Sequence, residues 1–242
     1  MTHKRQALVT GANKGLGLAI AKGLASAGLL VWMGARDRSR GEDAVQTLRG
    51  EGFDVRFIQI DVADDASVRR AAKTIEHEIN ALDVLVNNAG IVLDLQTPPS
   101  ELSMDDVKAT YEVNVFGPIR VTQAFAPLLK AADDARIVNM SSGVGSLTLI
   151  TDPTSLFSTV NLLAYTSSKV ALNAVTVSFA KEFEPFGIKV NAVEPGHVRT
   201  DLNGNSGFLT PEEGAETAIR MALLDKGGPT GGFFGSHGRQ PW

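Results

Sequence analysis

Tyr165 and Lys169 are the residues whose types and spacing could do acid–base chemistry in this sequence. Residues four apart lie on one face of a helix, one turn from each other. An ammonium beside a phenol favours the phenolate, so we expect Lys169 to lower the pKa of Tyr165 from about 10. Such a phenol can exchange a proton near neutral pH, as reduction of a carbonyl by hydride requires. The spacing alone also fits a Tyr–Lys pair on the surface that has no catalytic role. Because the chain has only 2 tyrosines, the choice of a catalytic phenol is narrow.

Two serines, Ser141 and Ser142, follow the apolar segment Arg136–Met140, which is typical of a buried strand. A hydroxyl at the end of such a strand could hydrogen-bond a substrate oxygen. Terminal serines are also ordinary caps of turns and helices. The spacing does not distinguish Ser141 from Ser142.

A glycine-rich turn, Thr10-Gly11-Ala12-Asn13-Lys14-Gly15-Leu16-Gly17, lies between the first predicted strand and the first predicted helix. Glycines allow a sharp turn and a close approach to a pyrophosphate, whose charge then sits at the N-terminus of the helix. The turn therefore predicts a dinucleotide site. The alternative is a tight turn that binds nothing.

The charges near the second strand predict which dinucleotide binds. Arg36 lies 19 residues after Gly17, close to the offset of about 20 at which such folds contact the ribose. Arg36 and Lys14 together favour a 2′-phosphate, and hence NADPH or NADP over NADH. Asp37 would instead be the ribose ligand if the strand ended one residue later. Solvated charges and an Arg36–Asp37 pair are further alternatives.

Two more polar segments follow predicted strands. Asp61, with Val62 beside it, follows the third strand and could accept a hydrogen bond from an adenine amino group. The run Asn87-Asn88-Ala89-Gly90 follows the fourth strand, and its small residues would let the backbone lie against a cofactor. Asparagine and glycine also form turns, and both roles can hold together.

The elements that must position these residues alternate along the chain. Apolar runs predict about seven strands, at residues 6–9, 29–34, 55–60, 84–87, 136–140, 189–193 and 232–234. Segments of helical period lie at residues 15–27, 40–49, 66–79, 104–131, 160–186 and 211–224, the last with Thr210 as N-cap. This alternation predicts a single α/β domain over residues 1–242, a doubly wound, Rossmann-like parallel sheet with helices on both faces.

Composition excludes several classes of site and partner. The chain of 242 residues has a net charge of -4 without a basic face for nucleic acid, and it has no cysteine for disulfides or zinc. Its 4 histidines show no metal-ligand spacing. We expect no signal peptide and no membrane-spanning segment, and therefore a cytoplasmic protein.

Taken together, these motifs resemble the short-chain dehydrogenases/reductases over nearly the whole chain. The similarity includes the glycine turn, Asn-Asn-Ala-Gly, Val113-Asn114-Val115-Phe116-Gly117, the serine strand, Tyr-x-x-x-Lys and Pro195-Gly196, in that order. Within the family the chain looks most like the NADPH carbonyl reductase branch. The similarities there are Asn13-Lys14, Ala35-Arg36-Asp37, the segment 198–202 and a C-terminus ending in Trp242.

The resemblance implies a role for each matching residue. Tyr165 would donate the proton, and Lys169 would lower the pKa of Tyr165 and hold the nicotinamide ribose. Ser142 would position the carbonyl, and is preferred because Gly145 stands where the family has a glycine. Asn114 would keep a water in a proton path to Lys169, or would simply bond the backbone. The nicotinamide side would be lined by Pro195, Gly196, Val198 and Thr200.

The chain departs from many relatives in the 23 residues that separate Ser142 from Tyr165. The extra segment, residues 148–163, could shield a helix that otherwise forms a dimer face, or could form a wall of the substrate pocket. Both a monomer and a homo-oligomer therefore remain open.

Residues 203–209 are expected to form a flexible lid over the substrate, or a plain loop. His197 could touch substrate or be structural.

The function expected from this pattern is NADPH-dependent reduction of a small ketone, aldehyde or quinone. One alternative is an NADP-dependent alcohol or hydroxysteroid dehydrogenase that works mainly in the oxidative direction, since one site catalyses both directions. A second alternative is a non-catalytic dinucleotide-binding regulator, which would typically have lost the serine, tyrosine or lysine. All three residues are present.

Overall fold

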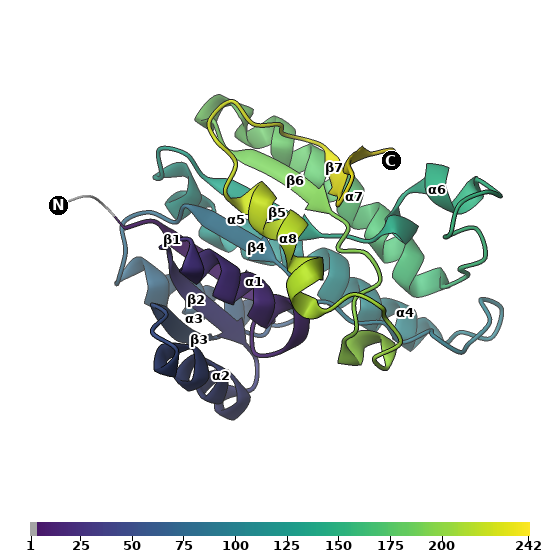
Figure 1. Ribbon diagram of the computed structural model, residues 1–242, viewed down its shortest axis with the longest axis horizontal. Coiled ribbons are helices and arrows are strands. Elements are labelled where there is room, and N and C mark those ends of the chain that lie inside the picture. Colours follow the sequence, from purple (N-terminus) through teal and green to yellow (C-terminus); the bar gives the residue numbers. More distant parts are fainter. Residues whose placement is uncertain (1–3) are drawn as a thin grey trace.

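Short apolar runs of the chain form the strands of one sheet in the computed structural model, which describes residues 4–242 (Figure 1). The strand order is β3-β2-β1-β4-β5-β6-β7-β8, and every neighbouring pair is parallel except β7 and β8. The predicted doubly wound parallel sheet is confirmed. The strands are β1 (Gln6–Thr10), β2 (Leu30–Ala35), β3 (Val55–Gln59), β4 (Val84–Asn87), β5 (Arg136–Met140), β6 (Lys189–Val193), β7 (Phe233–Gly235) and β8 (Gly238–Gln240).

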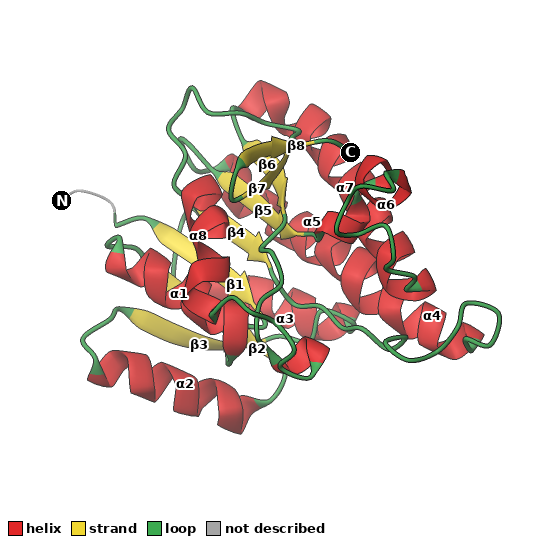
Figure 2. Ribbon diagram, turned by 45° about the vertical axis from the view of Figure 1, so that its right-hand side comes forward, coloured by secondary structure: helices red, strands yellow, loops and turns green. Residues whose placement is uncertain are grey.

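Helices cover both faces of the sheet, because side chains alternate along each strand (Figure 2). In β1, Ala7 and Val9 pack against α1, α2 and α8, whereas Leu8 packs in the core formed with α3, α5 and α7. The helices are α1 (Gly15–Ser26), α2 (Arg38–Gly50), α3 (Asp65–Glu76), α4 (Met104–Tyr111), α5 (Gly117–Lys130), α6 (Leu147–Thr151), α7 (Leu163–Phe183) and α8 (Pro211–Ala222).

Two of the predicted helices are not continuous. The segment 104–131 is divided into α4, a π-helical turn at Glu112–Phe116, and α5. Pro118, in the first turn of α5, has no N–H to continue a regular ladder of hydrogen bonds from α4. The segment 160–186 becomes helical only at Leu163, and a 3-10 turn at Glu184–Phe186 follows α7.

The segment between Ser142 and Tyr165 contains the short helix α6, which the sequence pattern does not predict. Thr148 of α6 donates two hydrogen bonds to the carbonyl of Trp242, from its backbone N–H at 3.1 Å and its hydroxyl at 2.7 Å. The ring of Trp242 stacks on Phe233 of β7 at 5.7 Å. The extra segment is thereby attached to the far edge of the sheet.

Among residues 4–242, none of the helices has the length and apolar character that spanning a bilayer requires.

Candidate active site

The carboxyl ends of β1 to β6 lie along one edge of the sheet, because these strands are parallel. Ligands of open α/β sheets bind along that edge. Most predicted site residues follow directly from these ends, namely the glycine turn after β1, Arg36 after β2, Asp61 after β3, Asn88 after β4, Ser142 after β5 and Pro195 after β6.

The glycine turn is packed so closely that side chains would not fit. Gly11 and Gly15 have φ of 64° and 53°, which L side chains rarely adopt. A Cβ added to Gly17 would lie 2.3 Å from the carbonyl oxygen of Gly11. The Asn88 side chain donates to the carbonyls of Thr10 at 2.9 Å and Gly11 at 3.2 Å, so it supports the turn from β4. Glycine at these positions therefore lets the turn close tightly at the start of α1.

Lys14 forms an ion pair with Asp201 in this structure, with 2.6 Å between Nζ and Oδ2. Both side chains are exposed, and the hydrogen bond from Lys14 holds the pKa of Asp201 below its usual range. Asp201 lies just after Thr200, on the segment predicted to border the nicotinamide. The pair thus joins the glycine turn to that segment across the candidate cofactor site.

Asp37 and Arg36 have different surroundings. Asp37 caps α2, accepting from the backbone N–H of Arg40 at 3.0 Å and pairing with its guanidinium at 3.0 Å. The hydrogen bonds from Arg40 lower the pKa of Asp37. Arg36 is exposed, and its guanidinium has no protein partner within residues 4–242. The alternative Arg36–Asp37 pair is not formed, and Arg36 is the residue left to meet a ligand.

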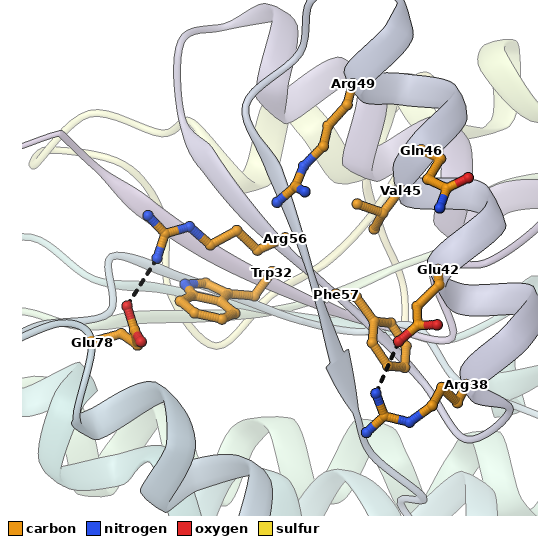
Figure 3. A pocket seen from close by; sticks show the side chains of 9 residues that line it. All are labelled: Trp32, Arg38, Glu42, Val45, Gln46, Arg49, Arg56, Phe57 and Glu78. Atoms are coloured by element: carbon orange, nitrogen blue, oxygen red, sulfur yellow. Dashed lines mark hydrogen bonds and ion pairs between the residues drawn. The ribbon is translucent and has the colours of Figure 1, made fainter.

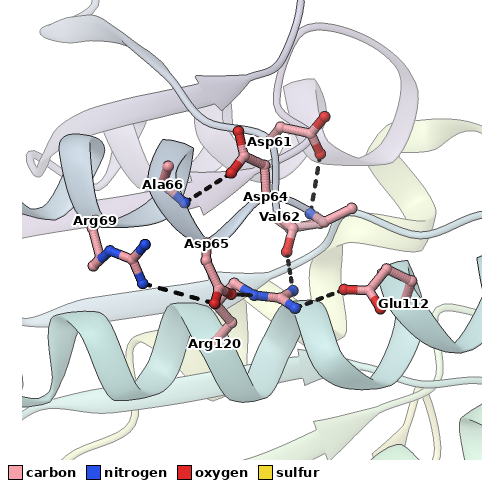
Figure 4. Close-up of polar contacts among 9 residues, drawn as sticks. Asp61, Val62, Asp64, Asp65, Ala66, Arg69, Glu112 and Arg120 are labelled. Atoms are coloured by element: carbon pink, nitrogen blue, oxygen red, sulfur yellow. Dashed lines mark hydrogen bonds and ion pairs between the residues drawn. The ribbon is translucent and has the colours of Figure 1, made fainter.

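The loop after β3 has an ordered polar backbone. Asp61 accepts a hydrogen bond from the backbone N–H of Ala63 at 3.0 Å through Oδ1, and its own N–H donates to Ser67 at 2.9 Å. The carbonyl of Val62 accepts a hydrogen bond from Arg120 of α5 (Figure 4). The local sequence pattern does not identify Arg120, although it is the only charge between Gly117 and Leu129.

Lys169 is buried where α7 meets the ends of β4 and β5, with only 5% of its surface exposed. Its Nζ donates to the carbonyl of Met140 at 2.8 Å and lies 5.4 Å from the centroid of the Tyr165 ring. A Cβ added to Gly90 would lie 3.7 Å from this Nζ and 3.4 Å from Oδ1 of Asn114. The structure therefore brings Gly90, Asn114, Tyr165 and Lys169 together.

The two serines after β5 have different partners. Ser141 is buried, and its hydroxyl donates to Asn173 of α7 at 2.7 Å. Ser142 hydrogen-bonds the phenol of Tyr165. The structure thus places Ser142, the serine preferred from the family pattern, beside the tyrosine.

The prediction that Tyr165 has a lowered pKa is wrong for this structure. Burial raises the pKa of Tyr165 to about 12, the hydrogen bond with Ser142 opposes that shift, and the charge of Asp94 adds to it. Burial also lowers the pKa of Lys169 to about 8, so the ammonium is itself poorly solvated. Helical spacing predicted the pair of residues, but their pKa values depend on the solvent that the fold removes.

Asn114 lies in the π-helical turn and is buried. Its amide exchanges two hydrogen bonds with the backbone of Ile91, both at 2.9 Å, and donates to the hydroxyl of Ser168 at 3.1 Å. These contacts match the second role expected for Asn114, in which its side chain hydrogen-bonds the backbone. The water that the family resemblance implies stays a prediction.

Asp94 is a further residue of the site that the sequence analysis missed. It is 1% exposed, and its Oδ2 accepts the backbone N–H groups of Ala164 at 2.7 Å and Tyr165 at 3.3 Å. Its Oδ1 is buried and has no hydrogen-bond partner in the described chain. Asp94 thus caps α7 from a position 70 residues away. One feature of the sequence could have identified this residue, because Asp94 is the only charged residue in the segment 84–100.

The segment after β6 is hydrogen-bonded to residues 208 and 209, which follow it in the chain. Gly196 has φ of 78°, and Val198 pairs with Leu209 in an isolated bridge. The backbone N–H groups of Phe208 and Leu209 donate to the carbonyl of His197 at 3.1 and 3.2 Å. The ring of His197 packs edge-on against Phe208 at 5.6 Å. Residues 203–209 therefore form a loop that is hydrogen-bonded to the segment after β6, and the ring of His197 packs against this loop.

The extra segment before Tyr165 lies along α7 and also reaches the serines. Leu147, Ile150 and Val160 line a cavity of about 520 Å³ together with Val170 and Ala174 of α7. A Cβ added to Gly143 would lie 2.1 Å from Cζ of Phe157. Phe157 therefore packs on Gly143, the residue after Ser142, so the segment both covers α7 and borders the candidate site.

A second cavity, of about 450 Å³, lies at the β3 edge of the sheet (Figure 3). Arg56 lies over the ring of Trp32 at 5.3 Å, and Arg38 lies over the ring of Phe57 at 5.7 Å. None of the predicted site residues lines it. Its charges are partly paired, as between Arg38 and Glu42 at 2.9 Å.

Comparisons with known proteins find similar chains that cover most of this one. The family model described as short chain dehydrogenase matches residues 5–207. A (+)-neomenthol dehydrogenase of Arabidopsis thaliana is 37% identical, over 95% of this chain and 95% of the relative. The carbonyl reductase [NADPH] 1 of Rattus norvegicus is 34% identical, over 98% of both chains. The crystal structure of an NADPH-bound carbonyl reductase from chicken fatty liver superposes with a TM-score of 0.87, at 28% identity, covering 99% of this chain and 100% of the other.

The substitution Asp94→Asn should lower the pKa of Tyr165 from about 12, because it removes a negative charge that disfavours the phenolate. Asparagine keeps an oxygen that can cap α7. The measurement is an ultraviolet titration of the phenolate in a Tyr111→Phe background, in which Tyr165 is the one remaining tyrosine. Tyr165→Phe in the same background supplies the baseline. A pKa that stays the same or rises would contradict the assigned effect of Asp94.

The substitution Lys169→Met should stabilise the protein at neutral pH. Lowering the lysine pKa from 10.5 to about 8 costs stability in full below about pH 8, and the cost disappears above the unfolded value. The gap is worth about 3 kcal/mol, and losing the bond to Met140 costs about 1, which leaves a gain of about 2 kcal/mol.

Urea unfolding at several pH values measures this gain, which should shrink above about pH 8 and reverse before pH 10.5 is reached. Lys181→Met is the matched control, because Lys181 is an exposed lysine on the same helix. A variant less stable than the wild type at neutral pH would show that the ammonium is better solvated than its burial indicates.

Proposed function

The chain belongs to the short-chain dehydrogenase family, and we propose that it reduces ketones, aldehydes or quinones with NADPH, using Tyr165 as the proton donor. The observation that carries the proposal is the meeting of Ser142, Tyr165 and Lys169 beside Gly90, at the edge of the sheet where ligands bind. The relative named carbonyl reductase [NADPH] 1 supports reduction as the reaction.

The residues present fit NADPH. The glycine turn leads into the N-terminus of α1, where Gly17 leaves no room for a Cβ beside Gly11 and where the charge of a phosphate would be favoured. The Arg36 guanidinium is free to pair with a 2′-phosphate, and Lys14 is the second cation. The residues proposed to hold the cofactor are Gly11, Asn13, Lys14, Gly15, Leu16, Gly17, Arg36, Asp61, Val62, Asn88, Ala89, Gly90, Tyr165, Lys169, Pro195, Gly196, Val198 and Thr200.

NADPH held at this site would supply the hydride that reduces the carbonyl carbon. Ser142 donates a hydrogen bond to the carbonyl oxygen, and Tyr165 transfers its phenolic proton to the same oxygen. A pKa raised to about 12 keeps this phenol protonated at neutral pH, as a proton donor must be. Lys169 compensates the phenolate that remains, and Asn114 holds the backbone beside Gly90 and, in this proposal, a water that returns the proton.

The oxidative direction is the second candidate, because a relative that is 37% identical to this chain over the aligned residues is named (+)-neomenthol dehydrogenase. The same groups serve both directions, with the tyrosine accepting the proton that the alcohol loses. Rates measured with NADPH plus ketone and with NADP plus alcohol distinguish the two.

The test mixes the purified protein with NADPH and a panel of aryl ketones, quinones and aldehydes, and follows NADPH absorbance. We expect turnover that falls by about a thousandfold or more in Tyr165→Phe, since proton transfer contributes a factor of about 10²–10⁴. The variant should still bind NADPH, as fluorescence of the bound nucleotide reports. Unchanged turnover in Tyr165→Phe would refute the assigned proton donor.

The substitution Arg36→Ala should raise the KM for NADPH by about tenfold or more, because a charge-assisted pair with the 2′-phosphate is worth about 1.5–3 kcal/mol. The KM for NADH should change much less. Arg38→Ala is the matched control, because Arg38 is a nearby exposed arginine that pairs with Glu42. Equal changes for both nucleotides would reject Arg36 as the phosphate ligand.

A further inference from the structure

Arg120 of α5 uses all three guanidinium nitrogens to join separate segments of the chain (Figure 4). Its Nε donates to Asp65 in the first turn of α3. Its Nη1 donates to the carbonyl of Val62 at 2.6 Å, and its Nη2 donates to Glu112 at 2.6 Å. The side chain is 21% exposed, so these bonds are partly shielded from water. The planar guanidinium can donate to several partners in fixed directions at once, and the compact ammonium of a lysine does not reproduce that geometry.

Val62 is held by α5 at two points. Its carbonyl accepts from Arg120, and its side chain packs on Gly117, where an added Cβ would lie 3.0 Å from Cγ2 of Val62. Gly117 and Arg120 are three residues apart and therefore share a face of α5. The neighbouring Asp61 is held by the turn that its carboxylate forms with Ala63. The position of the loop after β3 thus depends on α5.

Glu112, the third partner, is the first residue of the π-helical turn that contains Asn114. Asn114 in turn holds Ile91, the residue after Gly90. A single guanidinium therefore connects the loop at the adenine side of the candidate cofactor site with the turn at its catalytic side.

We propose that Arg120 is a positioning residue for the adenosine half of NADPH. It acts by holding the Asp61–Val62 loop in place through the Val62 carbonyl, without touching the nucleotide. This inference rests on the proposed function, because it takes the loop after β3 as the adenine side of an NADPH site.

A general electrostatic role would not need this geometry. Asp65 also has Arg69 within reach at 3.7 Å, so its charge keeps a second cation when Arg120 is changed. What Arg120 alone supplies is the bond to Val62 joined with the bonds to Asp65 and Glu112. Lysine at this position keeps the charge and loses the fork.

The experiment measures the Kd of adenosine 2′,5′-bisphosphate, the adenosine half of NADPH, by titration calorimetry. We expect the Kd to rise about tenfold in both Arg120→Met and Arg120→Lys, as loss of a charge-assisted hydrogen bond implies. Arg69→Met is the matched control, because it removes the exposed partner of Asp65 alone. Its Kd should equal that of the wild type. Steady-state kinetics should show a matching rise in KM for NADPH with kcat retained.

Each outcome has one meaning. A Kd in Arg120→Lys equal to that of the wild type, or an equal loss in Arg69→Met, would overturn the assignment of Arg120. A fall in kcat as large as the loss of affinity would also overturn it, because the residue would then act on the whole site. Arg120→Lys keeps the test decisive if Arg120→Met fails to fold. No binding by the wild type would overturn the proposed function together with this inference.

Discussion

The hydrogen bond from the buried ammonium of Lys169 to the carbonyl of Met140 is the contact on which the arrangement of the site depends. It joins α7 to the end of β5. Ser142 lies two residues beyond Met140, and Tyr165 lies one turn before Lys169, so one contact aligns both. Burying an ammonium against a neutral carbonyl is costly, because water solvates a charge better. The protein carries that cost at the place where its proposed chemistry needs a charge beside a phenol.

A chain of buried amides and hydroxyls keeps α7 from shifting along the sheet. The Asn87 side chain donates to Asn139 at 2.8 Å, and Asn139 donates to Thr176 of α7 at 2.9 Å. Thr176 lies seven residues, or two turns, after Lys169, so α7 is bonded to β5 near both of these residues. Apolar contacts alone would permit several registers, whereas these directional hydrogen bonds favour one, even though Oδ1 of Asn87 has no partner among residues 4–242. The distance between Tyr165 and Ser142 is set in this way from beneath the site.

Features of the fold that depend on a few neighbouring residues could be predicted from the sequence. Apolar runs identified seven strands, and helical spacing paired Tyr165 with Lys169, because both features act over a few residues. β8, with the sequence Gly-Arg-Gln, has no apolar side chain and therefore shows no such run. Asp94 and Arg120 were missed because their partners lie up to 71 and 58 residues away. The pKa of Tyr165 was predicted with the wrong sign for the same reason, since burial and Asp94 are properties of the folded chain.

The π-helical turn at Glu112–Phe116 explains how one helical segment can serve two ends of the proposed cofactor site. An extra residue in a turn rotates all later side chains by about 100° relative to a regular helix. Asn114 therefore faces Ile91 and Ser168 on the catalytic side, while Arg120 faces Val62 on the adenine side. A continuous helix over residues 104–131 could not give both directions with this spacing. The irregularity that interrupts the predicted helix is thus what lets α4 and α5 connect the two sides.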